Sequence, residues 1–129
     1  MSSQINRPLS PHLQIYRLPL TAILSITHRI TGVILSVAAL VMVWVLAAAA
    51  SGIQSYESAY AHLASWYGQI FLVGVTFSLY LHFCNGIRHL FWDAGMGFEL
   101  DTADKTAKLV IAGTIILTAA TWLVAITAG

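Results

Sequence analysis

Three long stretches of this 129-residue chain contain no Asp, Glu, Lys or Arg. They run from Ile30 to Ala50, from Trp66 to Ile87 and from Leu109 to Gly129. Each holds about 20 residues, and a helix of that length matches the hydrocarbon core of a bilayer, which is about 30 Å thick. Backbone groups in lipid must satisfy one another, so each stretch is expected to be helical. The sequence therefore predicts an all-α membrane protein with three transmembrane helices.

The composition agrees with this fold class. Charged residues make up 9% of the chain, whereas a soluble domain has about 25%. The formal net charge is only +1, so nothing in the overall charge indicates a nucleic-acid partner. The one cysteine, Cys84, excludes an internal disulfide and is interpreted as a small apolar filler.

Helix bounds follow from the residues that flank the apolar stretches. Pro19 suits the first turn of a helix, so the first helix is expected to begin well before Ile30. We predict one membrane-anchor domain over residues 1–129, with an arm at 1–18 and transmembrane helices at about 20–50, 66–92 and 107–128. The segments 51–65 and 93–108 are interpreted as linkers.

The basic residues predict how the chain crosses the membrane. The six are Arg7, Arg17, Arg29, Arg88, Lys105 and Lys108. All of them flank the first helix at its start or surround the second linker, whereas the first linker has none. Because cytoplasmic segments are enriched in Lys and Arg, we expect the N-terminus to lie in the cytoplasm and the C-terminus outside.

Polar residues form a stripe along the second helix. Ser78, His82, Asn85 and His89 follow one another at spacings of four, three and four, which places them on one helical face. This face is expected to meet protein, cofactor or water, because lipid would leave its hydrogen bonds unmade. His82 can then be an axial haem ligand or make an interhelical hydrogen bond. No second histidine is expected at its depth, because His28 is interpreted as too shallow, so another chain would have to supply a second ligand.

Two smaller polar groups lie near the predicted cytoplasmic ends. Ser25, His28 and Arg29 share one face of the first helix. They could contact a quinone head group or haem propionates, or Arg29 could simply reach up to lipid phosphates.

At the end of the second helix, Arg88 and Asp93 are interpreted as an ion pair. Trp92 beside them suits the membrane interface.

Two sequence motifs resemble those of a known family. Ser10-Pro11-His12, followed by the run from Ser25 to Gly32 (SITHRITG), resembles the N-terminal signature of the succinate dehydrogenase cytochrome b subunit. The run from His82 to Asp93 (HFCNGIRHLFWD) is similar to the second signature of that family. With three predicted helices, the resemblance covers nearly the whole chain.

The resemblance implies a function and a set of residue roles. Its members anchor succinate:quinone oxidoreductase, and they pack with a second membrane anchor beneath an iron–sulfur subunit and a flavoprotein subunit. The haem-ligating histidine of the family falls on His82, with the other ligand from the second anchor. The quinone-contacting residues fall on Ser25 and Arg29, and His28 and Arg29 fall near the propionates of haem b. The chain would thus carry electrons to ubiquinone without being catalytic alone.

Other functions remain compatible with the residues themselves. The alternatives are a fumarate reductase anchor, a haem-free membrane assembly or transporter subunit, and a self-contained di-haem cytochrome. No transit peptide is visible, so the expected location is a bacterial inner membrane, in contact with lipid.

Overall fold

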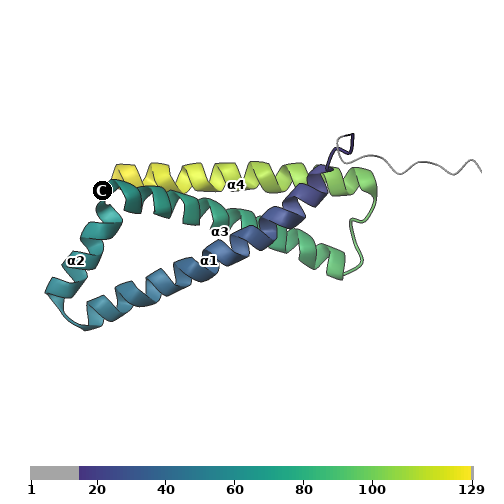
Figure 1. Cartoon of the computed structure of the whole chain (residues 1–129). Coiled ribbons are helices and arrows are strands. Elements are labelled where there is room, and N and C mark those ends of the chain that lie inside the picture. The colour runs from purple at the N-terminus through teal and green to yellow at the C-terminus, as the bar shows by residue number, and fades with distance from the viewer. Residues whose placement is uncertain (1–14, 129) are drawn as a thin grey trace, which may run out of the picture.

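A computed structural model describes residues 15–128, which form four α-helices (Figure 1). The helices are α1 (Leu20–Ala50), α2 (Ile53–Ala64), α3 (Trp66–Asp93) and α4 (Leu100–Ala128). Three of them, α1, α3 and α4, are long and apolar enough to cross a membrane. They contain 31, 28 and 29 residues. The all-α class and the three apolar spans are confirmed, and no strand occurs in residues 15–128.

Among the three long helices, α1 crosses α3, and α3 packs beside α4. In Figure 1, α1 passes obliquely over α3, while α3 and α4 run close together from the C-terminal end of the chain. The buried apolar core lies where all three meet, and it consists of Leu24, Leu81, Ala107 and Val110. Cys84 packs against this core as a half-buried apolar residue, in agreement with its predicted role as a filler.

The short helix α2 was not expected, because residues 51–65 were interpreted as a linker. Gly52 has a φ of 116°, a conformation that suits glycine, and this ends α1 before α2 begins. Ser65 then starts α3, since its side chain accepts a hydrogen bond from the backbone N–H of Gly68 at 3.2 Å. In Figure 1, α2 spans the gap between the ends of α1 and α3.

Helix α4 begins at Leu100, earlier than the predicted start at about residue 107. The added turns are polar and contain two ion pairs four residues apart, Asp101 with Lys105 and Asp104 with Lys108. Such pairs stabilise a helix where it leaves the apolar phase, and Asp101 also suits the positive N-terminal end of the helix dipole. Hydropathy alone missed these turns because they are charged.

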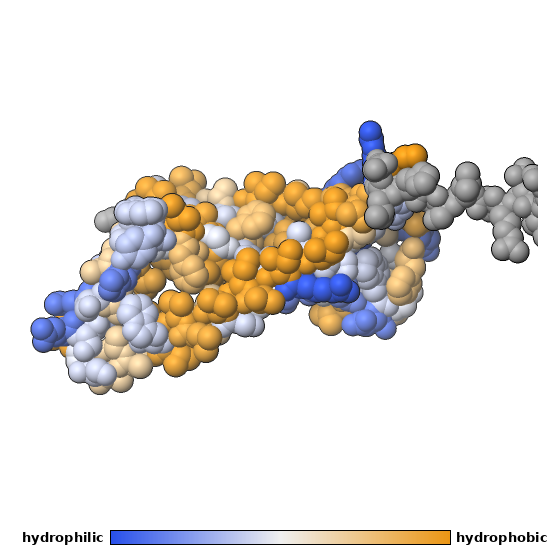
Figure 2. All heavy atoms as spheres, viewed as in Figure 1, coloured by the Kyte–Doolittle hydropathy of each residue, from blue (hydrophilic) through white to orange (hydrophobic). Residues whose placement is uncertain are grey.

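Much of the apolar side-chain area is exposed. Figure 2 shows hydrophobic residues along the middle of the molecule and hydrophilic residues near its two ends. Leu40 is 71% exposed, Leu109 69% and Ile116 65%. Apolar area of this extent would not be stable in water, so these surfaces face lipid or other apolar helices.

Candidate functional site

Three histidines from two helices gather where α1 crosses α3. The ring of His28 on α1 stacks on the ring of His82 on α3, with centroids 3.9 Å apart and planes inclined by 10°. The ring of His89 lies on the other side, with its centroid 5.1 Å from that of His28 and its plane tilted by 33°. The crossing therefore makes one cluster from residues far apart in the sequence.

The expectation that His28 lies too shallow to meet His82 is wrong. The sequence predicts a first helix at about 20–50 with His28 near its cytoplasmic end, and in the structure α1 begins at Leu20. His28 is thus about 12 Å along α1 from its first residue, at about 1.5 Å per residue. His82 is about 16 Å from the end of α3 at Asp93 by the same measure. The centroid distance of 3.9 Å shows directly that the two side chains lie at the same depth.

Hydrogen bonds at Nδ1 select one tautomer of the neutral His82 ring. This nitrogen lies 3.1 Å from the Thr31 hydroxyl oxygen and 3.1 Å from the backbone carbonyl oxygen of His28. The carbonyl can only accept, and the Thr31 hydroxyl already donates to the same carbonyl at 2.9 Å. Both contacts are favourable only when Nδ1 carries a hydrogen and donates. The lone pair of the neutral ring is then on Nε2.

Gly32 allows the His82 ring to lie close to α1, whereas the space at Gly86 is ordinary. A Cβ atom at Gly32 would lie 3.3 Å from Cε1 of His82, and a Cβ atom at Gly86 would lie 3.9 Å from Cε1 of His28. The first distance is tighter than a side chain normally tolerates. The absence of a side chain at Gly32 therefore gives the His82 ring its place against α1.

The polar stripe of α3 faces the other helices, as predicted. Ser78 is 3% exposed and Asn85 is fully buried. The side-chain amide of Asn85 donates to the backbone carbonyl of Leu24 on α1 at 3.4 Å. Of the two interpretations of His82, the interhelical hydrogen bond is present, and it leaves Nε2 available as a ligand.

Arg88 does not pair with Asp93, contrary to expectation. Five residues on a helix correspond to a rotation of about 140° past one full turn, so the two side chains point apart. Arg88 instead is buried and donates to the Thr106 hydroxyl and the Ala103 carbonyl oxygen on α4, both at 3.0 Å. Its guanidinium also contacts Asn85 and lies 4.0 Å from the centroid of the Trp92 ring. Arg88 therefore joins α3 to α4.

The remaining predicted site residues lie near the start of α1. Ser25 is half-buried and Arg29 is exposed, and Arg29 makes no ion pair with a carboxylate in residues 15–128. Ser25 and Arg29 flank His28 on α1, close to where the His28 ring stacks on His82 of α3. Ser10, Pro11 and His12, together with most of the predicted arm at 1–18, lie outside the described residues.

Sequence reasoning missed the residues that hold His82 in place. Thr31 and Gly32 are part of the motif that resembles the family signature, but the sequence does not indicate that they contact His82. A serine or threonine one turn after a histidine and followed by glycine only weakly indicates a contact with another helix. The sequence does not show which helix crosses at that position. The burial of Arg88 was missed for the same reason.

His82 can supply one axial ligand to a haem iron, and the stacking of the His28 ring on it prevents His28 from binding the same iron. Lone pairs of an imidazole lie in the plane of the ring, so rings that stack face to face cannot direct them at one atom between them. His28 and His82 therefore cannot ligate the same iron as they stand. The described residues also contain no group of three or more His, Cys, Asp or Glu placed to hold a bare metal ion.

Comparisons with known proteins identify the family that the chain resembles over most of its length. Residues 3–121 match the model of the succinate dehydrogenase/fumarate reductase transmembrane subunit family. The chain is 45% identical over 119 residues to the succinate dehydrogenase cytochrome b556 subunit of Paracoccus denitrificans, covering 92% of each chain. The cytochrome b556 subunit of Rickettsia conorii is 41% identical over 118 residues, or 91% of each chain. The cytochrome b560 subunit of Reclinomonas americana is 33% identical over 129 residues, covering 96% of this chain and 90% of the relative.

Proposed function

Because this chain belongs to the succinate dehydrogenase/fumarate reductase transmembrane subunit family, we propose that it anchors a succinate:quinone oxidoreductase in the membrane and supplies His82 to a b-type haem. The observation that carries the proposal is the hydrogen bonding of His82. Its Nδ1–H is held by α1 and its Nε2 is left as a ligand atom, the arrangement typical of histidines that bind metals.

The residues around His82 fit a haem edge. His28 has a buried Nδ1 without a hydrogen-bond partner in the described part of the chain, so it can still donate to an acceptor such as a propionate. Arg29, one residue further along α1, is exposed and carries a fixed charge that pairs with carboxylates. When bound, the haem would supply one-electron redox chemistry. The other axial ligand would come from a second membrane anchor.

We also propose that Ser25 and Arg29 contact the quinone head group, which supports ubiquinone reduction near the cytoplasmic face. A hydroxyl and a guanidinium are suitable donors to quinone carbonyl oxygens, and four residues separate them on one face of α1. Electrons would arrive from an iron–sulfur subunit fed by a flavoprotein. The chain itself has one cysteine, too few to ligate an iron–sulfur cluster through cysteine thiolates.

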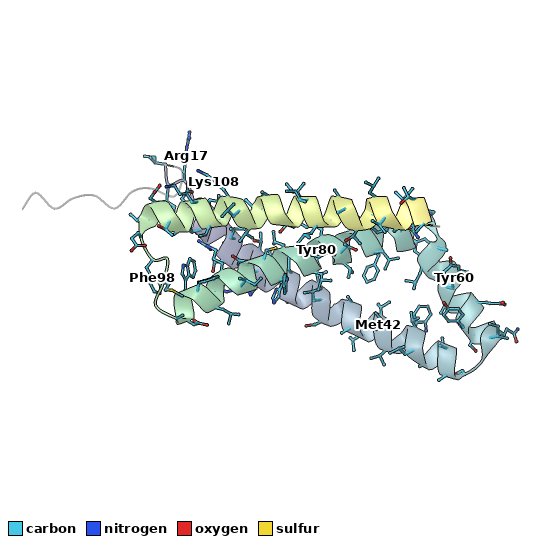
Figure 3. The ribbon with its side chains drawn as sticks, turned by 180° about the vertical axis from the view of Figure 1, so that it is seen from behind. Arg17, Met42, Tyr60, Tyr80, Phe98 and Lys108 are labelled. Carbon is cyan, nitrogen blue, oxygen red and sulfur yellow. The ribbon has the colours of Figure 1, made fainter. Side chains whose placement is uncertain are left out.

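The proposed location is a bacterial inner membrane with the N-terminus in the cytoplasm. Arg17, Lys108 and Phe98 lie at one end of the molecule in Figure 3, and Tyr60 lies at the other. The positive-inside rule supports a cytoplasmic position for the end that holds Arg17 and Lys108.

The test is the reduced-minus-oxidised absorption spectrum of the purified complex with His82→Leu. We expect the low-spin b-type signal to be lost or strongly weakened while the partner chains still co-purify. The matched control is His62→Leu, because His62 lies on α2 and bonds to the Tyr67 hydroxyl at 2.6 Å, away from the cluster. An unaltered spectrum and midpoint potential in the His82 variant would refute the assignment.

A further inference from the structure

Thr31 is placed differently from most hydroxyl side chains of the long helices. It is 5% exposed and lies on α1 one turn after His28 and directly before Gly32. Threonines such as Thr76 and Thr114 bond only to a carbonyl of their own helix four residues earlier. Thr31 donates to the carbonyl oxygen of His28, three residues earlier on its own helix, and also contacts a side chain of α3.

The direction of these hydrogen bonds makes the Thr31 oxygen an acceptor toward His82. Its single hydrogen is used in the 2.9 Å bond to the His28 carbonyl oxygen. The lone pairs of the hydroxyl are therefore the part that faces Nδ1 of His82 at 3.1 Å. Thr31 accepts the imidazole hydrogen, and the His28 carbonyl shares it from 3.1 Å.

We propose that Thr31 is a positioning residue for His82, fixing its tautomer and ring plane and strengthening electron donation from Nε2. The inference rests on the proposed haem-ligand role of His82. The position of Gly32 supports this inference, because a Cβ atom there would lie only 3.3 Å from Cε1 of the His82 ring. The Thr31 oxygen would then hold the ring by a hydrogen bond, and the space beside Gly32 would set how closely the ring approaches α1.

The physical consequence is a shift of redox potential. An acceptor at Nδ1–H makes an imidazole more basic, and a more basic ligand stabilises ferric over ferrous iron. Removal of the Thr31 oxygen should therefore raise the midpoint potential. The His28 carbonyl still accepts the hydrogen, so the result should be a shift and a change of ring orientation rather than loss of the ligand.

The experiment compares four forms of the purified complex: wild type, Thr31→Val, Thr31→Ser and Thr114→Val. Valine keeps the shape of threonine without the acceptor, and serine keeps the acceptor without the methyl group. Thr114 is the control, because it is fully buried and bonds only to the Val110 carbonyl of its own helix. The readouts are the haem midpoint potential and the electron paramagnetic resonance spectrum of the oxidised low-spin haem, which depends on the planes of the axial imidazoles.

We expect Thr31→Val to raise the potential and move the resonance lines, with Thr31→Ser and Thr114→Val close to wild type. Wild-type values in Thr31→Val would overturn the inference, and so would equal shifts in all three variants. If Thr31→Val lost its haem entirely, a normal Thr31→Ser complex would support the role of the oxygen, and haem loss in both would overturn it. The haem-ligand proposal fails separately, if His82→Leu keeps the wild-type spectrum.

Discussion

The two nitrogen atoms of His82 have different surroundings, and this difference determines what the side chain can do. Nδ1 is occupied by hydrogen-bond acceptors of α1, so Nε2 is the atom that remains for a ligand. The surroundings of His28 differ from those of His82. Its ring stacks against His82, and its Nδ1 has no hydrogen-bond partner in the described residues. In the proposed site, His82 would bind iron through Nε2 and His28 would donate a hydrogen bond through Nδ1.

For the quinone contacts, Arg29→Ala should reduce succinate-driven quinone reduction more than Ser25→Ala does. A hydrogen bond from a charged donor is worth about 1.5–3 kcal/mol, against about 0.5–1.5 kcal/mol for a neutral donor. The first value corresponds to about one to two orders of magnitude in rate. Arg29→Lys should restore only part of it, because an ammonium cannot replace the planar fork of a guanidinium.

The measurement compares quinone reduction with succinate-driven reduction of a dye that accepts electrons upstream. Dye reduction should stay near normal in assembled complexes. Equal loss of both activities would mean failed assembly, and full quinone activity in Arg29→Ala would leave Arg29 as a contact to lipid phosphates.

The long helices could be predicted from the sequence because each has an uninterrupted apolar stretch, but their contacts could not. Apolar runs show which segments enter the membrane, and the polar stripe shows which face of α3 meets protein. Neither pattern gives the crossing point of α1, and that point decides that Thr31 meets His82 and that Arg88 turns to α4. Helix α2 and the first turns of α4 were missed because their polar residues resemble a linker.

Arg88 links α3 to α4 by hydrogen bonds, and substitution of Arg88 should destabilise the complex. Arg88→Ala removes a buried charged donor to Thr106 and Ala103 and leaves the Asn85 side-chain oxygen without that donor. We expect a loss of about 1.5–3 kcal/mol, seen as a lower thermal midpoint of the purified complex. Lys105→Ala is the matched control, because its ion pair with Asp101 is exposed and is worth about 0.3–0.5 kcal/mol. Equal midpoints in the two variants would contradict this role.

Arg17 and Lys108 lie at one end of the molecule and Tyr60 at the other (Figure 3). The histidine cluster includes His28, which lies in the first third of α1, the helix that begins shortly after Arg17. The other end carries α2. The proposed orientation follows from the positive-inside rule. It would place the proposed quinone contacts on the cytoplasmic side, where electrons from the proposed iron–sulfur subunit would arrive. The exposed apolar surfaces between the two ends are available to lipid and to a second anchor.

Cysteines placed at the two ends test this orientation. Ser55→Cys in α2 and Glu99→Cys before α4 are both at exposed positions, and each is made in a Cys84→Ala background. In sealed, right-side-out vesicles an impermeant thiol reagent should label the Ser55 variant alone, and inverted vesicles should give the opposite result. Labelling of both variants from one face would overturn the proposed topology.

We propose that this chain supplies one of the two haem ligands, and the most direct test is the absorption spectrum of the chain expressed with and without its partner anchor. Stacked rings prevent His28 from serving as the second ligand to the iron held by His82. With the partner present, we therefore expect a six-coordinate low-spin b-type spectrum that is lost in His82→Leu. Without the partner, the chain should contain no haem or give a different spectrum. A normal six-coordinate spectrum from this chain alone would contradict the shared site.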